Sequence, residues 1–554
     1  PKGLLERLLE MADALLYESY LVIEEIYRSQ SILSSPDLVE VQGLYFKKNA
    51  ALLKPRKLSQ DFSKNISLLN LEAREEQESF AKEVGLLLKD EPVSLIQAPT
   101  GIGKTYGYLL PALSQAKERQ IVLSVPTKIL QNQIMEEEGK CLKEVFHIDI
   151  HSLKGPHNYL KLDAFYRSLQ ENDENRLFRR FKMQLLVWLT ETETGDLDEI
   201  GQLYRYQHFL IDLRHDGNLS SQSLFVTEDF WKRSQERAQT CKLLVTNHAY
   251  LVTRLEDNPE FVSDRLLIID EVQKILLALE NLLQETYDIQ SIIDLLDKAL
   301  LEEQNKVQQR ILESIRFECF YLIEQFQSGK SRKNILDSLA NLHQYFSELE
   351  VEGFEELVRY FTADRDYWLE AIETSQKKIQ ISSTKSGRIL LSSLVPDSCQ
   401  VLGVSATLEI SQRVSLADLL GYPEAKFVKI EAGKKQDQEV VLVKDFPLVT
   451  ETSLEVYAKE VADLLMDVQD FQQPILVLFT AKDMLLAVSD LLPVSHLAQY
   501  KNGDVHQLKK RFEKGEQQIL LGAASFWEGV DFSSHPFVIQ VVPRLPFQNP
   551  QEPL

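Results

Sequence analysis

Short apolar runs alternate with amphipathic helical patterns along most of this chain. Apolar runs of about four to eight residues are typical of buried strands, and strands that alternate with helices predict a parallel sheet covered by helices on both faces. The predicted strands form a first series and a second, shorter one: Val93 to Gln97, Ile121 to Val125, Leu243 to Thr246, Leu266 to Asp270 and Val401 to Ala406, then Ile475 to Thr480, Ile519 to Ala523 and Phe537 to Val542. The pattern therefore predicts an α/β fold.

Two long stretches of mostly helical pattern interrupt the first series, at about residues 154–240 and 276–385. In the second stretch, Leu276, Leu279 and Leu283 recur at helical spacing. Both stretches can be plain helical core. Long excursions from a compact domain are often functional, so a role in substrate handling is an equal alternative.

The N-terminal region differs in pattern from the rest. Residues 1–60 predict one or two amphipathic helices, a β-like segment from Val39 to Phe46 and a basic connector from Lys54 to Lys57. We expect a helical connector over 1–60, a first sheet domain with both insertions over 61–415, and a second, incomplete sheet domain over 416–554. Because the chain begins with Pro1 and stops just after a strand-like run, we expect it to be part of a longer protein or a processed one.

Composition narrows the class of protein. With 554 residues and 44% hydrophobic content, the chain can bury several cores. No apolar run approaches the roughly 18 residues that cross a bilayer, and Glu6, Glu10 and Asp13 are unlike a signal peptide, so we expect no membrane partner. The widely spaced cysteines, without a C-x-x-C pair, disfavour a disulfide framework and fit a reducing, cytoplasmic compartment. They are Cys141, Cys241, Cys319 and Cys399.

The net charge of -23 argues at first against a nucleic-acid partner, because phosphate contacts need Lys and Arg. Acidic segments such as Glu191 to Glu199 can nevertheless keep a protein soluble while a groove elsewhere stays positive. The stretch from Lys154 to Lys182 leans basic, and a solvated helical face and a DNA-facing surface are equal alternatives for it. Its other basic residues are Lys161, Arg167, Arg176, Arg179 and Arg180.

A glycine-rich turn joins the first predicted strand to a helical pattern. Such a turn leaves backbone amides pointing into one concavity at a helix N-terminus, where phosphates can be held. Lys104 would reach the β- and γ-phosphates, and Thr105 would ligate Mg²⁺. A tight turn with a solvated lysine is the weaker alternative. The turn consists of Ala98, Pro99, Thr100, Gly101, Ile102, Gly103, Lys104 and Thr105, with Ala98 where the common pattern has glycine.

Two adjacent carboxylates, Asp270 and Glu271, follow another strand of the same series. Asp270 is expected on Mg²⁺, directly or through water, and Glu271 is expected to polarise the attacking water. Alone, an Asp-Glu pair usually marks a helix start. After a phosphate loop in the same series of strands, the pair becomes a strong indication of phosphoryl transfer.

Three other segments carry weaker signals. The run from Val404 to Leu408 ends a strand with hydroxyl groups that could link the nucleotide site to a second domain, but for this run alone a strand leading to a capped helix is the favoured explanation. In Ser525 to Asp531, Phe526 and Trp527 suit either a core or a ligand-contacting loop. For Lys154 to Tyr159, an ordinary turn is the favoured explanation.

Four segments resemble, in chain order, the Walker A, Walker B, third and fifth motifs of DinG/XPD-type superfamily 2 helicases. They are the glycine-rich turn, Asp270 to Gln273, Ser405 to Leu408 and Ser525 to Asp531. Further segments resemble other elements of that family, and the similarity extends from about residue 70 onward. They are Arg74 and Gln77 (the adenine-reading Q motif), Thr127 to Gln131 (the strand-contacting motif Ia), Thr246 to Ala249 (an N-H run before Walker B) and Arg544 to Phe547 (the R-L-P-F element of DinG proteins).

The resemblance implies two RecA-like domains that close on ATP and move 5′ to 3′ along single-stranded DNA. The first insertion would occupy the place of an iron-sulfur domain and the second that of a helical arch. We expect ATP and Mg²⁺ as ligands, single-stranded DNA as partner and a monomeric chain. The nucleotide-binding set implied is Arg74, Gln77, Ala98 to Thr105, Glu528 and Asp531, with Lys104 and Glu271 catalytic and Thr105 and Asp270 on the metal.

The sequence departs from the family pattern at several positions. Lys161 stands where relatives with a cluster have a cysteine, so we expect no iron-sulfur cluster, and duplex unwinding is in doubt. Gln273 replaces the histidine of the D-E-A-H box, and Val272 replaces its alanine, which can alter coupling without removing hydrolysis. The chain ends before the Q-x-x-G-R-x-x-R motif, whose arginines act on the γ-phosphate and are worth about 10³- to 10⁵-fold in rate.

Some DinG proteins without a cluster carry an exonuclease domain ahead of the helicase part, and the segment from Pro1 to Leu33 resembles the connector after such a domain. Our leading hypothesis is an ATP-dependent, single-strand-stimulated 5′-3′ DNA translocase or helicase. The alternatives are an ATP-regulated nuclease, with its exonuclease domain outside this sequence, and an ATP-responsive DNA-binding module with little turnover.

Overall fold

A computed structural model describes most of the chain. The described residues are 4, 7–8, 11, 38–48, 54–116, 119–171, 175–200, 206–220, 222–328, 332–372, 378–385, 387–408, 415–431, 439–444, 446–449, 451–503, 505–523, 526–527 and 538–546. They divide into two compact units, unit 1 (Pro1–Leu282 with Arg388–Gly433) and unit 2 (Leu283–Gly387 with Lys434–Leu554).

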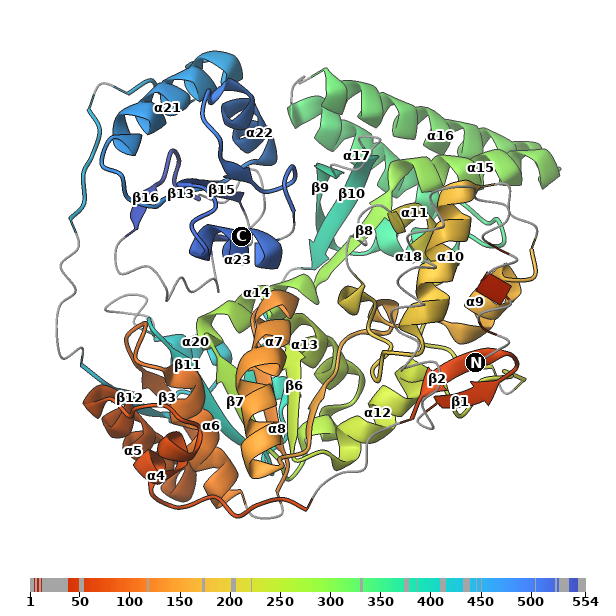
Figure 1. The fold of residues 1–554 in the computed structure, drawn as a ribbon. Helices are drawn as coiled ribbons and strands as arrows, with labels where there is room; N and C mark the ends of the chain where they lie inside the picture. Colours follow the sequence, from red (N-terminus) through yellow and green to blue (C-terminus); the bar gives the residue numbers. More distant parts are fainter. Residues whose placement is uncertain are drawn as a thin grey trace. The chain divides into compact units, whose positions relative to one another are not determined.

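A seven-stranded parallel sheet is the centre of unit 1 (Figure 1). Its order is β12-β3-β11-β7-β4-β6-β5, and every neighbouring pair is parallel. The five predicted strands of the first series are all present. The strands are β3 (Val93–Gln97), β4 (Ile121–Val125), β5 (Ile150–Ser152), β6 (Leu243–Asn247), β7 (Leu266–Asp270), β11 (Gln400–Ser405) and β12 (Lys426–Lys429). β12 belongs to this sheet although it lies beyond the domain boundary expected at residue 415.

Alternate residues of these strands enter two different cores. Ile96 and Ile268 pack on one face, whereas Leu95, Leu267 and Ile269 pack on the other. The first face is covered by α4 (Phe62–Leu68), α5 (Glu75–Asp90), α6 (Lys104–Gln115), α7 (Lys128–Ile134) and α8 (Lys140–Phe146); the second is covered by α13 (His248–Asp257), α14 (Ile275–Asn281), α19 (Leu391–Leu394) and α20 (Leu416–Leu420). This two-sided burial explains why the strands appear as continuous apolar runs.

The first insertion folds into its own aromatic-rich core in unit 1. Phe178 stacks on Phe209 and Phe181 on Tyr206, with ring centroids 4.5 and 4.4 Å apart. Its helices are α9 (Leu162–Ser168), α10 (Arg176–Trp188), α11 (Gln207–Leu210) and α12 (Phe230–Thr240). The β-like segment expected from Val39 to Phe46 is a hairpin of β1 (Leu38–Val41) and β2 (Leu44–Lys47), and its second strand packs into this core.

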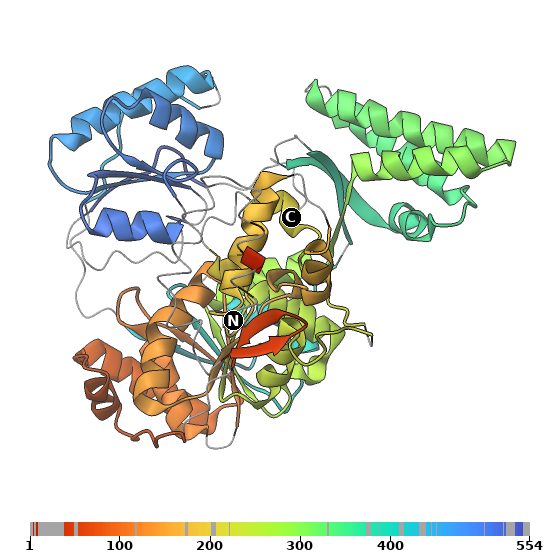
Figure 2. The same cartoon turned by 45° about the vertical axis from the view of Figure 1, so that its right-hand side comes forward.

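From Leu283 onward the second insertion lies in unit 2 and is largely helical, as expected, but this part begins and ends with strands of a sheet that the sequence pattern did not predict. Strands β8 (Gln284–Asp288), β9 (Arg365–Ile372) and β10 (Lys378–Lys385) form an antiparallel sheet of order β8-β10-β9. Helix α14 ends at Asn281, so Leu283 does not extend its apolar stripe. Beyond the strands lie the green helices of Figure 2: α15 (Ile289–Glu302), α16 (Lys306–Gln327), α17 (Arg332–Ser347) and α18 (Glu355–Thr362).

A second parallel sheet, of order β14-β15-β13-β16, completes unit 2. Helices α21 (Leu454–Gln469) and α22 (Lys482–Leu491) cover one face, and α23 (Val505–Glu513) covers the other. The strands are β13 (Ile475–Phe479), β14 (Leu497–Ala498), β15 (Ile519–Ala523) and β16 (Ile539–Val541). Two parallel sheets of this kind, with helical insertions, confirm the predicted α/β class and its RecA-like type. Within the described parts of the chain, we find no helix of the length and apolarity that a bilayer crossing needs.

Candidate functional site

The glycine-rich turn forms a loop between β3 and α6 in unit 1. Gly101 and Gly103 have φ of 79° and 81°, in the left-handed region that favours glycine, and Gly103 is the N-cap of α6. Nothing lies within 4 Å of where a Cβ on Gly101 would stand. Ala98, at the start of the loop, donates its amide to the carbonyl of Ser405 at 2.9 Å. The start of the loop is therefore held to β11 by a hydrogen bond, while its backbone at Gly101 is open at the N-terminus of α6.

The acidic pair lies beside this loop. Nζ of Lys104 is 3.1 Å from Oε1 of Glu271, with both side chains mostly buried. β7 delivers Asp270 at its carboxyl end, and Glu271 follows with φ of 45°. A positive φ at a residue other than glycine is strained, and such strain clusters at functional sites. The two strands and the helix thus bring together three of the residues that the sequence assigned to hydrolysis.

Asp270 lies deeper than Glu271 and has its own hydrogen bonds. Oδ2 accepts from the Tyr108 hydroxyl at 3.1 Å, and Oδ1 accepts from the amide of Glu271 at 3.0 Å. Burial and the neighbouring charge of Glu271 raise the pKa of Asp270 to about 6, against the opposing effect of Lys104. Sequence reasoning missed Tyr108, because a tyrosine on the helix after the loop has no signal of its own.

Glu271 is also connected to the third motif through Gln273. Nε2 of Gln273 donates to Oε2 of Glu271 at 3.0 Å, and Oε1 of Gln273 accepts from Oγ of Ser405 at 2.6 Å. Burial raises the pKa of Glu271, but the Lys104 charge and the hydrogen bonds from Gln273 and Lys104 outweigh it, so the pKa of this carboxyl lies below its usual range. Gln273 therefore connects Glu271 to Ser405 by hydrogen bonds, at the position where the D-E-A-H pattern has histidine.

The two residues of the Q-like motif contact the loop. Nη1 of Arg74 donates to the carbonyl of Gly101 at 3.0 Å, and Nε2 of Gln77 donates to the carbonyl of Gly103 at 2.9 Å. Both come from the start of α5, where Arg74 is the N-cap. They join the assembled cluster, and their expected adenine contacts stay a prediction.

The motif Ia and N-H segments meet behind the loop. Gln131, fully buried on α7, donates to the carbonyls of Leu153 and Val245 and accepts from Nδ2 of Asn247 at 3.0 Å. Nδ1 of His248 lies 2.7 Å from Oγ of Ser124. These residues hold three strand ends together, so their side chains support the site from within the sheet.

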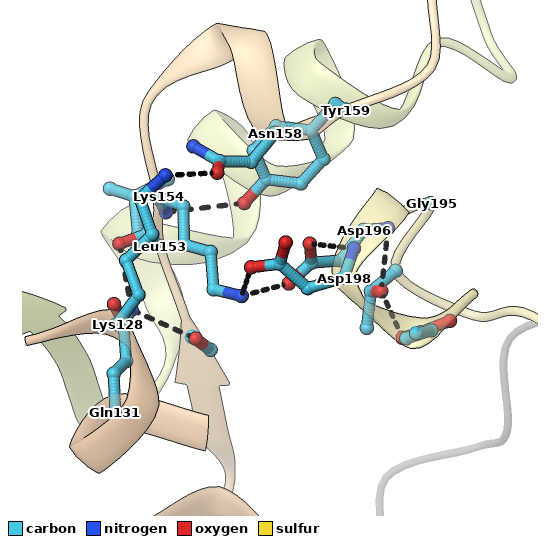
Figure 3. A network of polar contacts seen from close by, with 12 residues as sticks. Lys128, Gln131, Leu153, Lys154, Asn158, Tyr159, Gly195, Asp196 and Asp198 are labelled. Atoms are coloured by element: carbon cyan, nitrogen blue, oxygen red, sulfur yellow. Dashed lines mark hydrogen bonds and ion pairs between the residues drawn. The ribbon is translucent and has the colours of Figure 1, made fainter. Parts of the chain in front are cut away.

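The segment from Lys154 to Tyr159 is part of a buried polar network (Figure 3). Nζ of Lys154 lies 2.5 Å from Asp196 and 2.8 Å from Asp198, and Asn158 accepts from Nζ of Lys128 at 2.6 Å. Lys154 is only 1% exposed, and Lys182 is also buried. Neither alternative for the basic stretch, a solvated face or a DNA-facing surface, therefore holds at these two positions.

Only part of the predicted segment from Ser525 to Asp531 is among the described residues. Glu528 and Asp531 fall outside the described residues, as do Ser525, Gly529, Val530 and Phe547. Phe526 is buried against Gly522, and Nε1 of Trp527 donates to the carbonyl of Phe479 at 2.7 Å, so both aromatic residues belong to the second sheet's packing. The absence of an iron-sulfur cluster stays a prediction.

The residues present fit magnesium and a triphosphate. Open backbone at Gly101 suits phosphate oxygens, Lys104 supplies positive charge, and Thr105 and Asp270 are oxygen ligands of the kind that Mg²⁺ prefers. A chain of hydrogen bonds runs from this donor set through Glu271 and Gln273 to Ser405. The arrangement can bind a phosphate chain and hold a carboxylate beside it.

Two family models match the chain. Residues 77–187 match a DEAD/DEAH box helicase domain, and residues 465–554 match a helicase C-terminal domain. Among solved structures, an XPD helicase aligns with TM-score 0.46 and 15% identity over 86% of each chain. The Xpd4 protein of S. tokodaii aligns with TM-score 0.47 and 12% identity over 86% of this chain and 84% of that one.

Curated relatives cover nearly the whole sequence. A Bacillus subtilis protein named 3′-5′ exonuclease DinG is 25% identical over 87% of this chain, and a Staphylococcus epidermidis protein of the same name is 24% identical over 98%. The chain spans 63% and 70% of the length of these two relatives. The two helicase models, the DinG relatives and the ordered motifs agree: the chain carries a DEAD/DEAH box helicase domain and a helicase C-terminal domain, the domains of an ATP hydrolase, and is similar to DinG proteins.

Proposed function

We propose that this protein is an ATP-dependent translocase on single-stranded DNA, with 5′ to 3′ polarity. The observation that carries the proposal is the chain of contacts from Lys104 through Glu271 and Gln273 to Ser405. It ties the residues expected around the γ-phosphate to Ser405, the last residue of β11.

The proposed roles follow from the chemistry of each group. Mg²⁺ supplies charge neutralisation for the transferred phosphoryl group when it is bound. Lys104 binds phosphate oxygens, while Thr105 and Asp270 hold the metal. Glu271, kept ionised by Lys104 and by hydrogen bonds, orients and polarises the attacking water. Arg74 and Gln77 hold the loop carbonyls and lie on the side where the adenine would bind.

The proposed partner is single-stranded DNA, and we expect a monomeric, cytoplasmic protein. The test is ATP turnover by the purified chain with and without a single-stranded oligonucleotide, followed by displacement of a 5′- or 3′-end block to determine polarity. Turnover that a single strand stimulates supports the motor. Strand binding that responds to ATP without turnover supports instead a binding module.

A nuclease is the second candidate, because the relatives named above carry 3′-5′ exonuclease in their names. Since this chain spans only part of their length, we assign any nuclease activity to residues outside this sequence. Degradation of a labelled strand by the purified chain itself would contradict that assignment.

A further inference from the structure

Tyr500, in the turn after β14, has a backbone conformation that is unfavourable for a bulky residue. Its φ is 70°, in the left-handed region, where Cβ crowds the backbone and a large side chain is an outlier. Tyr500 is 48% exposed, so burial in a core does not explain why an aromatic residue stands there. Strain of this kind clusters at functional sites. The position therefore calls for a function of the exposed ring.

The residues on both sides of Tyr500 are fixed by hydrogen bonds. Oε1 of Gln499, a buried side chain, accepts from the amide of Ala523 at the end of β15 at 2.8 Å. Oδ1 of Asn502 accepts from the amide of Ala498 at 2.8 Å, which ties the far side of the turn to β14. The turn therefore presents the ring of Tyr500 from a backbone that is held in place.

A lysine from a neighbouring strand end lies beside this ring. β13, β14 and β15 are parallel, so their carboxyl ends meet at one edge of the second sheet, which is blue in Figure 1. Lys482, the first residue of α22 after β13, places Nζ 5.4 Å from the centre of the Tyr500 ring, which is a cation–π contact. Within the described part of the chain, no carboxylate is paired with Lys482. The edge thus offers an aromatic face together with an available cation.

We propose that Tyr500 stacks on a base of single-stranded DNA and that Lys482 binds an adjacent phosphate of the same strand. This inference rests on the proposed translocase function and adds to it a strand contact in the second sheet domain. Every base has a π face, so stacking tolerates any sequence, as movement along a strand requires. A ring that is already held in place loses little conformational freedom on binding, which gives a reason for the strained backbone.

The first test measures strand affinity in variants that keep or remove the ring. Fluorescence anisotropy of a labelled single-stranded oligonucleotide is recorded with the full chain for wild type, Tyr500→Gly, Tyr500→Asn and Tyr500→Phe. Glycine and asparagine accept a positive φ, so we expect melting temperatures at or above wild type, with affinity lowered about 5- to 100-fold by the loss of stacking. Tyr500→Phe keeps the ring and is expected to bind like wild type. The matched control is Phe471→Ala, because Phe471 is 69% exposed but precedes β13, at the opposite edge of the sheet.

The second test separates bases from phosphates. A strand of abasic nucleotides carries the same phosphates without bases, so Tyr500→Gly is expected to bind it as tightly as wild type does. Lys482→Ala is expected to weaken binding to both strands and to reduce the slope of log affinity against log salt by about 0.7, the value for one phosphate contact. Equal losses on both strands for Tyr500→Gly, or wild-type affinity of Tyr500→Gly and Tyr500→Asn for the normal strand, would overturn the inference.

The stacking contact and the proposed function can fail separately. A wild-type chain whose strand affinity depends on Tyr500, but whose ATP turnover the strand leaves unchanged, would contradict the translocase and keep the contact. A wild-type chain that the strand stimulates, with the same affinity in Tyr500→Gly, would overturn the contact and keep the translocase. A wild-type chain that binds no single strand would overturn both.

Discussion

Nζ of Lys104 lies 3.1 Å from Oε1 of Glu271, so the loop lysine and the second carboxylate of the acidic pair neutralise each other inside one site. A bound phosphate chain would offer the lysine a second anionic partner. Glu271 would keep the hydrogen bond from Gln273. The pair therefore holds the catalytic carboxylate ionised and in place, and the phosphate competes only for its contact with Lys104.

Replacing Glu271 separates binding from hydrolysis. Glu271→Gln keeps the shape of the side chain but removes the charge that polarises water. We expect turnover to fall by about 10²- to 10⁴-fold, the usual contribution of such a group, while nucleotide binding is retained. Turnover is measured by phosphate release and binding with a fluorescent ATP analogue. Hydrolysis at the wild-type rate in this variant would exclude Glu271 from the reaction.

Gln273 and Ser405 are predicted to act as one unit, because the hydroxyl of Ser405 donates to Oε1 of Gln273 at 2.6 Å. Ser405→Ala removes the hydrogen bond to Gln273, worth about 1 kcal/mol, together with the contacts of the hydroxyl to Glu271 and Thr407, and we expect turnover to fall by roughly fivefold with nucleotide affinity retained. Gln273→Ala is expected to cost more, since it also releases Glu271. If the two residues are coupled, the double variant resembles Gln273→Ala alone, whereas multiplied losses would contradict the connection.

Gly103 combines backbone strain with a close contact. Gly103→Ala places a Cβ 2.2 Å from Nε2 of Gln77 at φ of 81°. The amide group of Gln77 can move, but the strain of about 1–2 kcal/mol stays. We expect Gly103→Ala to lower the free energy of unfolding of unit 1 and to weaken nucleotide binding. Adding Gln77→Ala removes the clash together with the hydrogen bond from Gln77 to the carbonyl of Gly103, so urea unfolding should show at most partial recovery. Full recovery would mean that the backbone carries no strain.

The buried ion cluster of Lys154 is expected to matter for stability. Lys154→Met leaves Asp196, 14% exposed, without its cation, and breaking a buried pair in this way costs about 3–5 kcal/mol. Lys161→Met is a matched control, because Lys161 pairs with the half-exposed Asp216 at 2.6 Å and such pairs contribute about 0–1 kcal/mol. Chemical denaturation of both variants measures the difference. Equal losses would show that burial of Lys154 is unimportant.

Stability of unit 1 should fall in mild acid because two histidines are buried in the neutral form. Burial lowers the pKa of His151 to about 4 and that of His248 to about 3. Below pH 6.5 the unfolded chain binds protons that the folded histidines do not, so folding weakens as pH falls from about 6.5 to 4. The shift of His151 alone corresponds to about 3 kcal/mol. Urea midpoints at pH 7 and pH 5 measure this, and His151→Gln should reduce the difference.

The sequence predicted those elements that bury apolar residues on two faces. β3, β4 and β7 appear as apolar runs with the predicted bounds, because helices cover both sides of the sheet. The edge strand β12, with the sequence K-F-V-K, and the polar strand β8, with Q-E-T-Y-D, lack that signal, since neither is enclosed on two faces. Both depend on pairing with strands that are distant in sequence.

The residues of the candidate site also divide into those that the sequence pattern predicted and those that it did not. Lys104, Asp270 and Glu271 could be assigned because their spacing relative to strands carries the chemistry. Tyr108 and Gln131 lack such a signal, because they are defined by contacts formed after folding.

The central claim is that nucleotide held by the loop and the acidic pair is converted into movement along a single strand. Steady-state ATP turnover of wild type, Lys104→Ala and the exposed-residue control Lys140→Ala, each with and without single-stranded DNA, tests it most directly. We predict that DNA stimulates turnover in wild type and in Lys140→Ala and that Lys104→Ala has neither basal nor stimulated turnover. Turnover that survives Lys104→Ala, or that DNA leaves unchanged in the wild type, would contradict the account.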